Sequence, residues 1–205
     1  MTNQNAIEKA LETLRSDNLE VRADAIELLG EAEHAPAVPI LVEIIQDSDP
    51  GTYYLIVQAL GRIADERAVD TLLQAMRRDD IWVRAAATGA LIRIGGEASV
   101  SGLANGLNDE NKAVRRASAK ALGKIGVASD EVKRGLSGSL LDADKGVRRF
   151  AAEALGRLGE DTLVPELAQA LADEDPRTRI AAFKALANID TQEARDLVRK
   201  WAKDQ

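Results

Sequence analysis

The sequence predicts an all-α fold, a right-handed α-solenoid (alpha-alpha superhelix) built from about six helical hairpins of 31 residues, with capping helices at both ends. Three observations predict it. A ten-residue pattern recurs along the chain, its apolar residues are spaced as on one face of a helix, and each copy follows a residue that favours a helix start. Tandem copies of one pattern at a fixed period are typical of stacked units that cannot bury their apolar faces alone.

The repeated pattern is most complete in residues 21–30, 114–123 and 147–156, each of which begins with Val-Arg and ends with Leu-Gly. Weaker copies lie between and after them. The six copies start at residues 21, 52, 83, 114, 147 and 178, so every interval is 31 residues except one of 33.

Within each copy, counted from zero, positions 0, +4, +7, +8 and +11 lie on one stripe of a helix and are mostly apolar. Small residues at +4 and +7 allow neighbouring helices to approach closely, and Leu at +8 fills the seam between them. A second apolar pattern at helical spacing follows each copy and predicts the second helix of the hairpin. In the fourth copy the stripe consists of Val114, Ser118, Ala121, Leu122 and Ile125.

An Asn or Asp stands three residues before position zero in every copy, and Pro50 and Pro176 follow two of them. Such side chains accept hydrogen bonds from the free N–H groups of a first turn, and proline suits the first helical position. The first helices should therefore start near residues 19, 50, 81, 112, 145 and 176 of a single domain spanning 1–205. We expect residues 5–15 and 192–203 to cap the array, with Trp201 sealing the last hairpin. The predicted N-caps are Asn18, Asp49, Asp80, Asn111, Asp144 and Asp175.

The composition excludes several classes of function. The chain has no cysteine, which excludes disulfide and thiolate chemistry, and its one histidine, His34, falls in a turn with no second His or Cys, which nearly excludes a His-based metal site. A formal charge of -7 disfavours nucleic acid as a partner. No basic start with an apolar run and no apolar span of 18 residues are present, so we expect a cytoplasmic protein without membrane contact.

The consensus D-x-D-x-x-V-R-x-x-A-A-x-A-L-G-x-I-G, best matched by residues 109–126 and 142–159, resembles the short HEAT repeat of the phycobilisome (PBS) lyase HEAT-like family and of artificial alphaRep-type scaffolds. The resemblance covers the whole chain and implies an armadillo-like solenoid. The chain departs from it at Tyr53, where Arg is usual, and at Ile92 and Ala187, where Gly is usual. In that family the Asp and Arg of the repeat form a ladder between hairpins, which implies a structural role for Arg22, Arg84, Arg115, Arg148 and Arg179.

Positions -1, +2, +3, +6 and +10 lie opposite the apolar stripe, and resemblance to the artificial binders implies that they line a concave groove. In copies two to six these positions hold nine basic residues and one acid, Glu153, whereas the first copy holds Glu20, Asp24, Glu27 and Glu31. Aromatic and basic residues are common anchors of binding patches. The candidate binding residues are Tyr54, Arg62, Trp82, Arg93, Arg116, Lys120, Lys124, Arg149, Phe150 and Arg157, and Arg177 and Lys184 complete the nine basic residues.

These features favour a non-catalytic scaffold that holds an acidic protein partner and needs no cofactor. The resemblance leaves an alternative, a phycobilin lyase subunit or phycobilisome assembly or degradation factor acting on a phycobiliprotein, with a bilin stacked on Tyr54 and Trp82. HEAT-type DNA binding is a weaker alternative because the chain is acidic overall. A plain solvated face of helix-forming Lys and Arg is the competing structural explanation.

Glycines are unusually frequent in the predicted second helices of the middle repeats, at Gly102, Gly106, Gly135 and Gly138. Each costs up to about 1 kcal/mol relative to alanine inside a helix. With the two extra residues near Val127–Glu131, they indicate either a softer joint or tight helix contacts, and both alternatives remain open from the sequence.

Overall fold

The computed structural model describes residues 3–203, and all regular structure within this range is helical. Contacts between residues group the chain into two compact units, residues 1–102 and 103–205. The predicted fold class, an all-α solenoid of helical hairpins, is confirmed. The prediction of one continuous domain stays a prediction.

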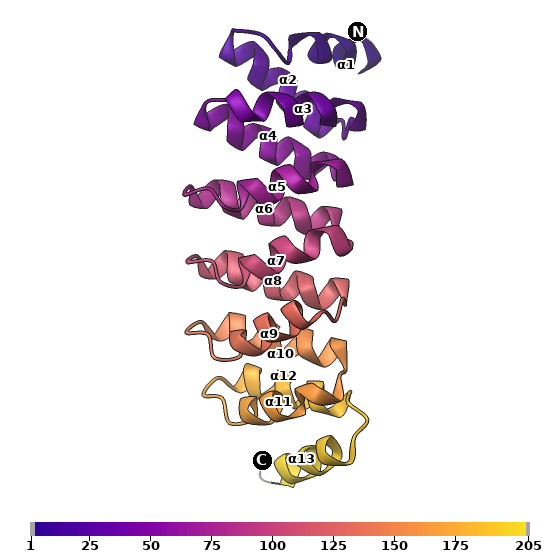
Figure 1. The fold of residues 1–205 in the computed structure, drawn as a ribbon, viewed down its shortest axis with the longest axis vertical. Coiled ribbons are helices and arrows are strands. Elements are labelled where there is room, and N and C mark those ends of the chain that lie inside the picture. The colour runs from indigo at the N-terminus through magenta and orange to yellow at the C-terminus, as the bar shows by residue number, and fades with distance from the viewer. Residues whose placement is uncertain (1–2, 204–205) are drawn as a thin grey trace. The chain divides into compact units, whose positions relative to one another are not determined.

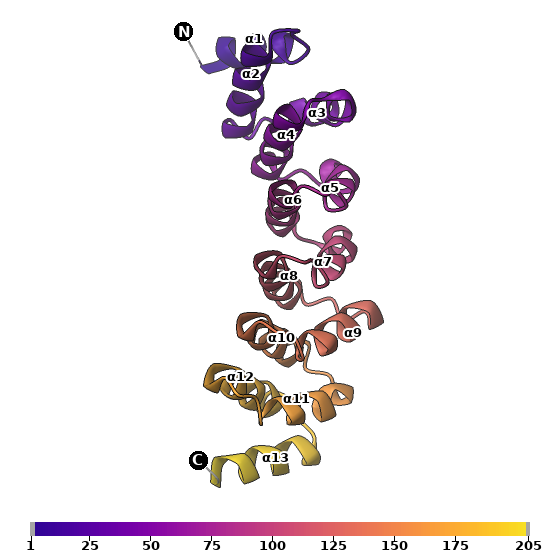
Figure 2. The ribbon, with the colours of Figure 1, turned by 90° about the vertical axis from the view of Figure 1, so that its left-hand side faces the viewer.

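The N-terminal unit pairs long first helices with short second helices (Figure 1). The first helices α2, α4 and α6 pack against one another in sequence order, and α1 packs on α2. Figure 2 shows α3 and α5 as a second row beside them. The helices are α1 (Asn3–Thr13), α2 (Leu19–Glu31), α3 (Val38–Ile44), α4 (Pro50–Ile63), α5 (Val69–Ala75) and α6 (Ile81–Ile94), with 3-10 turns at Ala35–Ala37, Ile45–Asp47, Glu66–Ala68 and Glu97–Ser99. The boundary between the two units falls within α7 (Val100–Gly106).

The C-terminal unit repeats this arrangement, with α8, α10 and α12 packed in one row. Its last helix covers the final hairpin, as predicted for Trp201. The indole ring of Trp201 lies 4.9 Å from the ring of Phe183, and its N–H donates to the Leu171 carbonyl at 3.3 Å. The helices are α8 (Lys112–Ile125), α9 (Asp130–Ser139), α10 (Lys145–Leu158), α11 (Val164–Ala170), α12 (Pro176–Ala187) and α13 (Gln192–Lys203), with a 3-10 turn at Asp161–Leu163.

The helix starts are set by the six Asx residues. The first helices begin at residues 19, 50, 81, 112, 145 and 176, and each preceding Asn or Asp accepts backbone N–H hydrogen bonds from the first turn. Asp80, for example, accepts from the Trp82 N–H at 2.7 Å. At the other end, α8 and α10 stop at Gly126 and Gly159, whose positive φ angles of 73° and 66° suit glycine.

The apolar stripe of each first helix faces the interior of its unit, except that Val21 and Ala32, at the two ends of the stripe of α2, are exposed. In the fourth copy Val114, Ser118, Ala121 and Leu122 are buried, and Ile125 is half-buried. The close approach that the small residues predict is also present. A Cβ added to Gly156 would lie 2.5 Å from the Cβ of Ala185, so α10 and α12 touch at this point.

Two of the second-helix glycines serve tight packing. A Cβ on Gly102 would lie 2.3 Å from the Leu73 side chain, and one on Gly135 would lie 2.7 Å from Leu107. Gly138, in contrast, has nothing within 4 Å of that position. For Gly102 and Gly135, the structure therefore favours tight helix contacts over the softer joint.

No helix within residues 3–203 is both long and apolar enough to cross a lipid bilayer. In the same range, no group of three or more His, Asp or Glu side chains is arranged to hold a metal ion.

Candidate binding surface

The positions predicted to face away from the core do so. Of the 25 positions at -1, +2, +3, +6 and +10 in copies two to six, only Ala181 is buried. The candidate residues fall in both compact units. Tyr54, Arg62, Trp82 and Arg93 lie on α4 and α6 of the N-terminal unit, and the other six lie on α8 and α10 of the C-terminal unit.

In the N-terminal unit, a hollow of about 330 Å³ lies between α4 and α6, with Tyr54, Trp82, Arg62 and Arg93 in its lining. The Trp82 side chain is 71% exposed, which is high for the largest apolar residue type. The two cations have acidic neighbours, because Arg62 lies 3.7 Å from Glu31 and Arg93 lies 3.4 Å from Glu33. This hollow is therefore aromatic, with its positive charge largely balanced.

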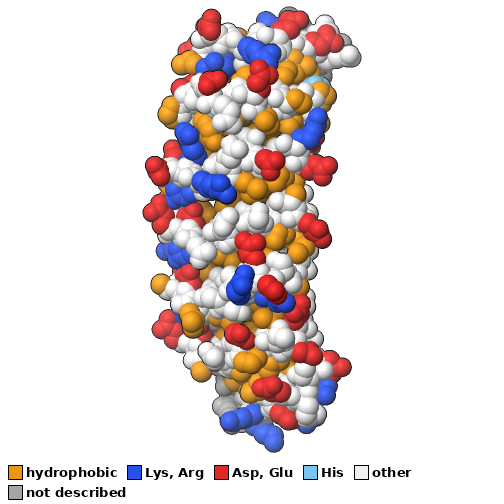
Figure 3. All heavy atoms as spheres, in the orientation of Figure 1, with side chains coloured by type: hydrophobic (Ala, Val, Ile, Leu, Met, Phe, Trp, Pro, Cys, Tyr) orange, Lys and Arg blue, Asp and Glu red, His pale blue; other side chains and the backbone are white. Residues whose placement is uncertain are grey.

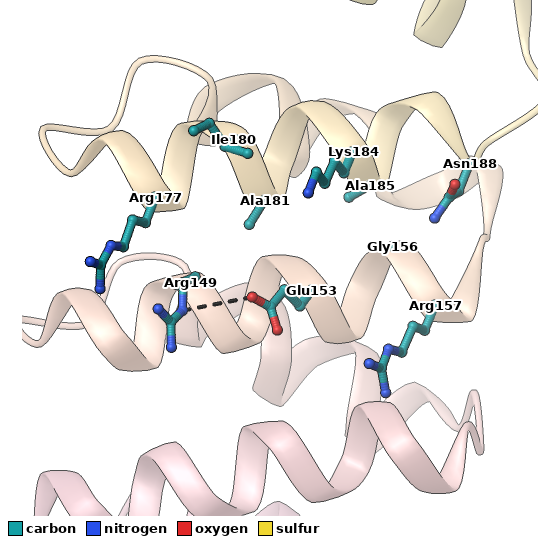
Figure 4. A pocket seen from close by; sticks show the side chains of 10 residues that line it. All are labelled: Arg149, Glu153, Gly156, Arg157, Arg177, Ile180, Ala181, Lys184, Ala185 and Asn188. Carbon is teal, nitrogen blue, oxygen red and sulfur yellow. Dashed lines mark ion pairs between the residues drawn. The ribbon is translucent and has the colours of Figure 1, made fainter.

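In the C-terminal unit, a hollow of about 380 Å³ lies between α10 and α12, and we call it the α10–α12 trough (Figure 4). Small residues form part of its lining, since the two helices touch at Gly156 and Ala185. Arg177 extends from the start of α12 toward α10, and Arg157 extends toward α8. The lining is Arg149, Glu153, Gly156, Arg157, Arg177, Ile180, Ala181, Lys184, Ala185 and Asn188.

The trough and its surroundings are rich in unpaired cations. Within residues 3–203, no carboxylate lies within 4.0 Å of the charged groups of Lys124, Arg157, Arg177 or Lys184. Arg149 has one such neighbour, Glu153, at 3.7 Å, too long for a hydrogen bond. Over the second helices of the C-terminal unit, Figure 3 instead shows acidic and basic side chains mixed together.

A second hollow, of about 450 Å³, adjoins the trough and shares Arg149 and Arg177 with it. Its wall includes the ring of Phe150, which is flanked by the Arg149 guanidinium at 4.4 Å and the Lys120 ammonium at 5.7 Å. The Nε of Arg149 is buried and has no hydrogen-bond partner. Arg149 and Phe150, which form a cation–π pair, thus line a hollow that a partner side chain can enter.

Arg116 differs from the other candidates because its guanidinium is already used. It binds both carboxylate oxygens of Asp144, with Nε 2.6 Å from Oδ1. The Arg116 side chain, together with the Val147 and Gly146 N–H groups, holds the pKa of the Asp144 carboxyl far below its ordinary value. Arg116 therefore fixes the start of α10 and has little charge left for a partner.

The ladder implied by the family resemblance is present at Arg115 and Arg148. Arg115 makes two hydrogen bonds to Asp142 of the following repeat, and Arg148 makes two to Asp173. Each arginine also donates to two backbone carbonyls of the loop before its own helix. Arg22 only approaches Asp49, at 3.6 Å, while Arg84 and Arg179 donate to carbonyls of their own loops. Arg115 and Arg148 therefore hold neighbouring repeats together.

The Arg116–Asp144 pair gives the protein a testable acid sensitivity. Asp144→Asn keeps the N-cap acceptor but removes the charge, so the variant should unfold more easily than the wild type near neutral pH. A carboxyl with a depressed folded-state pKa stabilises the fold above the unfolded-state pKa of about 3.9, and this contribution fades as the pH falls below that value. Urea denaturation at a series of pH values should therefore show the difference narrowing below about pH 4. A difference that stays constant with pH would contradict this role of the pair.

The fold and the exposed surface define a helical-repeat protein of the solenoid class. The HEAT-repeat model matches residues 7–92, 69–143 and 135–205, and the chain belongs to the HEAT repeat family. No curated protein sequence matches it at a significant level.

Solved structures with similar folds include three kinds of repeat protein. An engineered protein matches with a TM-score of 0.66 and 23% identity, covering 89% of this chain and 95% of that chain. A designed armadillo repeat protein in complex with the peptide (KR)4 matches with a TM-score of 0.67 and 16% identity, covering 90% and 99%. The complex of CpcE and CpcF of phycocyanin lyase from Nostoc sp. PCC7120 matches with a TM-score of 0.60 and 22% identity, covering 97% and 87%. At these identities the similarity shows the fold alone.

Proposed function

We propose that this HEAT-repeat protein is a non-catalytic scaffold that binds an acidic protein segment on the outward face of α8, α10 and α12. One observation carries the proposal. Lys124, Arg157, Arg177 and Lys184 lie on this face in or beside the α10–α12 trough, and no carboxylate of residues 3–203 lies within 4.0 Å of their charged groups. Cations left unpaired on one surface attract a partner of opposite charge and raise its association rate.

The pairing of the neighbouring arginines supports the same assignment. Arg115, Arg116 and Arg148 of this unit are each bound to an aspartate of the next repeat, so basic residues that serve the fold are recognisable by their partners. The unpaired cations serve no such role. The designed armadillo repeat protein that holds the peptide (KR)4 has a similar fold, which makes a peptide ligand sterically reasonable for this chain.

A binding assay with a defined probe tests the proposal. Fluorescence anisotropy with a labelled Glu/Asp-rich peptide should detect binding, and a Lys-rich peptide should not bind. The double variant Lys124→Glu with Arg157→Glu should bind the acidic peptide about 10- to 100-fold more weakly, because it replaces attraction by repulsion.

The matched control is Arg134→Glu with Lys200→Glu, which changes the net charge equally at two exposed residues of α9 and α13. It should retain most of the binding, and circular dichroism should show full helicity for both variants. Equal loss in both double variants would mean that only net charge matters and would refute the proposed surface.

A second candidate function follows from the N-terminal hollow between α4 and α6. Exposed Trp82 and neighbouring Tyr54 offer flat faces beside Arg62 and Arg93, an arrangement suited to a linear tetrapyrrole with its propionates. In this alternative the protein is a phycobilin lyase subunit or phycobilisome factor, as the similar fold of the CpcE and CpcF complex suggests. When the protein is titrated with a bilin, the absorption spectrum of the bilin should then shift, and Trp82→Ala should weaken this shift. An unchanged spectrum at micromolar concentrations would remove this candidate.

A further inference from the structure

We infer that the α10–α12 trough accepts a second copy of this chain, through an acidic stripe on its α2 helix. The acidic stripe consists of Glu20, Asp24, Glu27 and Glu31. The inference rests on the proposed function, since it requires that the trough binds acidic protein surfaces, and it names one such surface.

The acidic stripe is a straight row on one face of α2. Its members are separated by four, three and four residues, so their side chains lie one above another along about 16 Å of helix. All four residues are exposed. Glu31 approaches Arg62 at 3.7 Å, and no basic group within residues 3–203 lies within 4.0 Å of the carboxylates of Glu20, Asp24 or Glu27. The stripe therefore offers negative charge that its own unit leaves unbalanced.

The trough offers positive charge over a similar length. Arg149 and Arg157 are eight residues apart on α10, and Arg177 and Lys184 are seven apart on α12. At about 1.5 Å per residue, these pairs span about 12 Å and about 10 Å along their helices. A helix laid along the trough can place carboxylates near both ends of it at once.

The apolar parts of the two surfaces also correspond. Ile180, 46% exposed, lies between Arg177 and Lys184 on the trough wall. Leu19, 53% exposed, begins α2 beside the acidic stripe, and half-buried Ala23 lies one turn further along. Burial of Leu19 against Ile180 and the small trough residues would add a hydrophobic contribution to the charge pairing.

The charge distribution favours a contact between the N-terminal unit of one copy and the C-terminal unit of another over a contact between two N-terminal units. Residues 1–102 contain nine basic and 17 acidic residues, whereas residues 103–205 contain 18 basic and 17 acidic residues. Two N-terminal units repel each other because both are acidic. An N-terminal unit is instead attracted to the basic face of a C-terminal unit. Such a heterologous contact either closes into a ring of copies or continues into longer chains.

One helix on one pair of helices is a small interface, so the association should be weak and sensitive to salt. Light scattering coupled to size exclusion should therefore compare the wild type at about 0.01 M and about 1 M salt, where the Debye length is roughly 30 Å and 3 Å. The average mass should rise above that of one chain with protein concentration at low salt, and should return to it at high salt.

Two charge-reversed variants identify the surfaces. The stripe variant carries Asp24→Lys with Glu27→Lys, and the trough variant carries Arg177→Glu with Lys184→Glu. Each variant alone should stay monomeric, because the altered stripe has no net negative charge left to attract the trough, and the altered trough repels the unaltered stripe of another copy. An equal mixture should associate again, because the intact stripe of one fits the intact trough of the other, and the two reversed surfaces also fit. Circular dichroism checks that both variants are folded.

A wild type that stays monomeric at low salt, or a mixture that does not associate, would overturn the inference. The acidic-peptide assay separates this failure from failure of the proposed function. If the peptide binds the wild type and the stripe variant but not the trough variant, the scaffold proposal stands without self-association. If the wild type neither binds the peptide nor associates, both proposals are wrong.

Discussion

Arg148→Ala should lower the free energy of unfolding by about 3–5 kcal/mol, since removing one partner of a buried ion pair strands the other. The side chains of Arg148 and Asp173 are 9% and 8% exposed, and two hydrogen bonds of 2.7 and 3.1 Å join them. Arg148 also donates to the carbonyls of Asp142 and Ala143 and to Glu174. The substitution leaves the Asp173 carboxylate without its counter-ion in a place that water barely reaches.

Urea denaturation followed by circular dichroism measures this effect. Arg199→Ala is the control, because the Arg199–Asp196 pair is 70% and 61% exposed and should contribute about 0–1 kcal/mol. The double variant Arg148→Ala with Asp173→Ala should be less destabilised than the sum of the two single variants, since it removes the stranded charge. A cost below about 1 kcal/mol for Arg148→Ala would contradict the ladder as a buried network.

Gly156→Ala should destabilise the protein by about 1–3 kcal/mol, although alanine is the better helix former. The added Cβ would lie 2.5 Å from the Cβ and 2.6 Å from the Cα of Ala185. Neither atom can move without the α12 backbone, so α10 and α12 must separate. The lost contact should outweigh the gain of about 1 kcal/mol in helix propensity.

Gly138→Ala is the matched control for this prediction. Gly138 lies inside α9 and is exposed, and an added Cβ would have no atom within 4 Å. Here only the propensity term remains, so the variant should be more stable than the wild type by about 0.5–1 kcal/mol. In thermal denaturation, the melting temperature should fall for Gly156→Ala and rise for Gly138→Ala. A shift in the same direction for both would show that the Gly156–Ala185 contact is looser than described.

The sequence predicts much of this fold because each repeat carries its own local signals. An Asx residue that caps the first turn, such as Asp80, and a buried stripe of period 3.6 depend only on residues within one helix. Six copies of these signals leave little freedom in where the first helices begin. The division of the chain into two compact units depends instead on contacts summed over many residues, which no single motif reports.

The candidate surface is less predictable because its electrostatics depends on neighbouring repeats. The sequence indicates which residues face outward, but it does not distinguish a cation that is paired within the fold, such as Arg116, from one that is free to bind, such as Lys124. The structure separates them, since Asp144 of the next repeat binds Arg116, and no carboxylate of residues 3–203 lies within 4.0 Å of the Lys124 ammonium. Arg177 and Lys184 belong to the nine basic outward positions but not to the ten candidate binding residues, and both line the trough. Ion pairs between residues 25 to 28 positions apart form only when neighbouring hairpins stack, so the pattern within one repeat does not indicate them.

The two ends of the first helices differ in how much change they should tolerate. Loops that enter these helices are tied by the ladder, as when Arg148 binds the carbonyls of Asp142 and Ala143. The loops that leave these helices begin at Gly126 and Gly159, where a Cβ added to the glycine would have no neighbouring atom within 4 Å. The one interval of 33 residues gains its extra length after Gly126. Engineers who wish to graft a tag or a foreign domain into this protein should choose those exit loops.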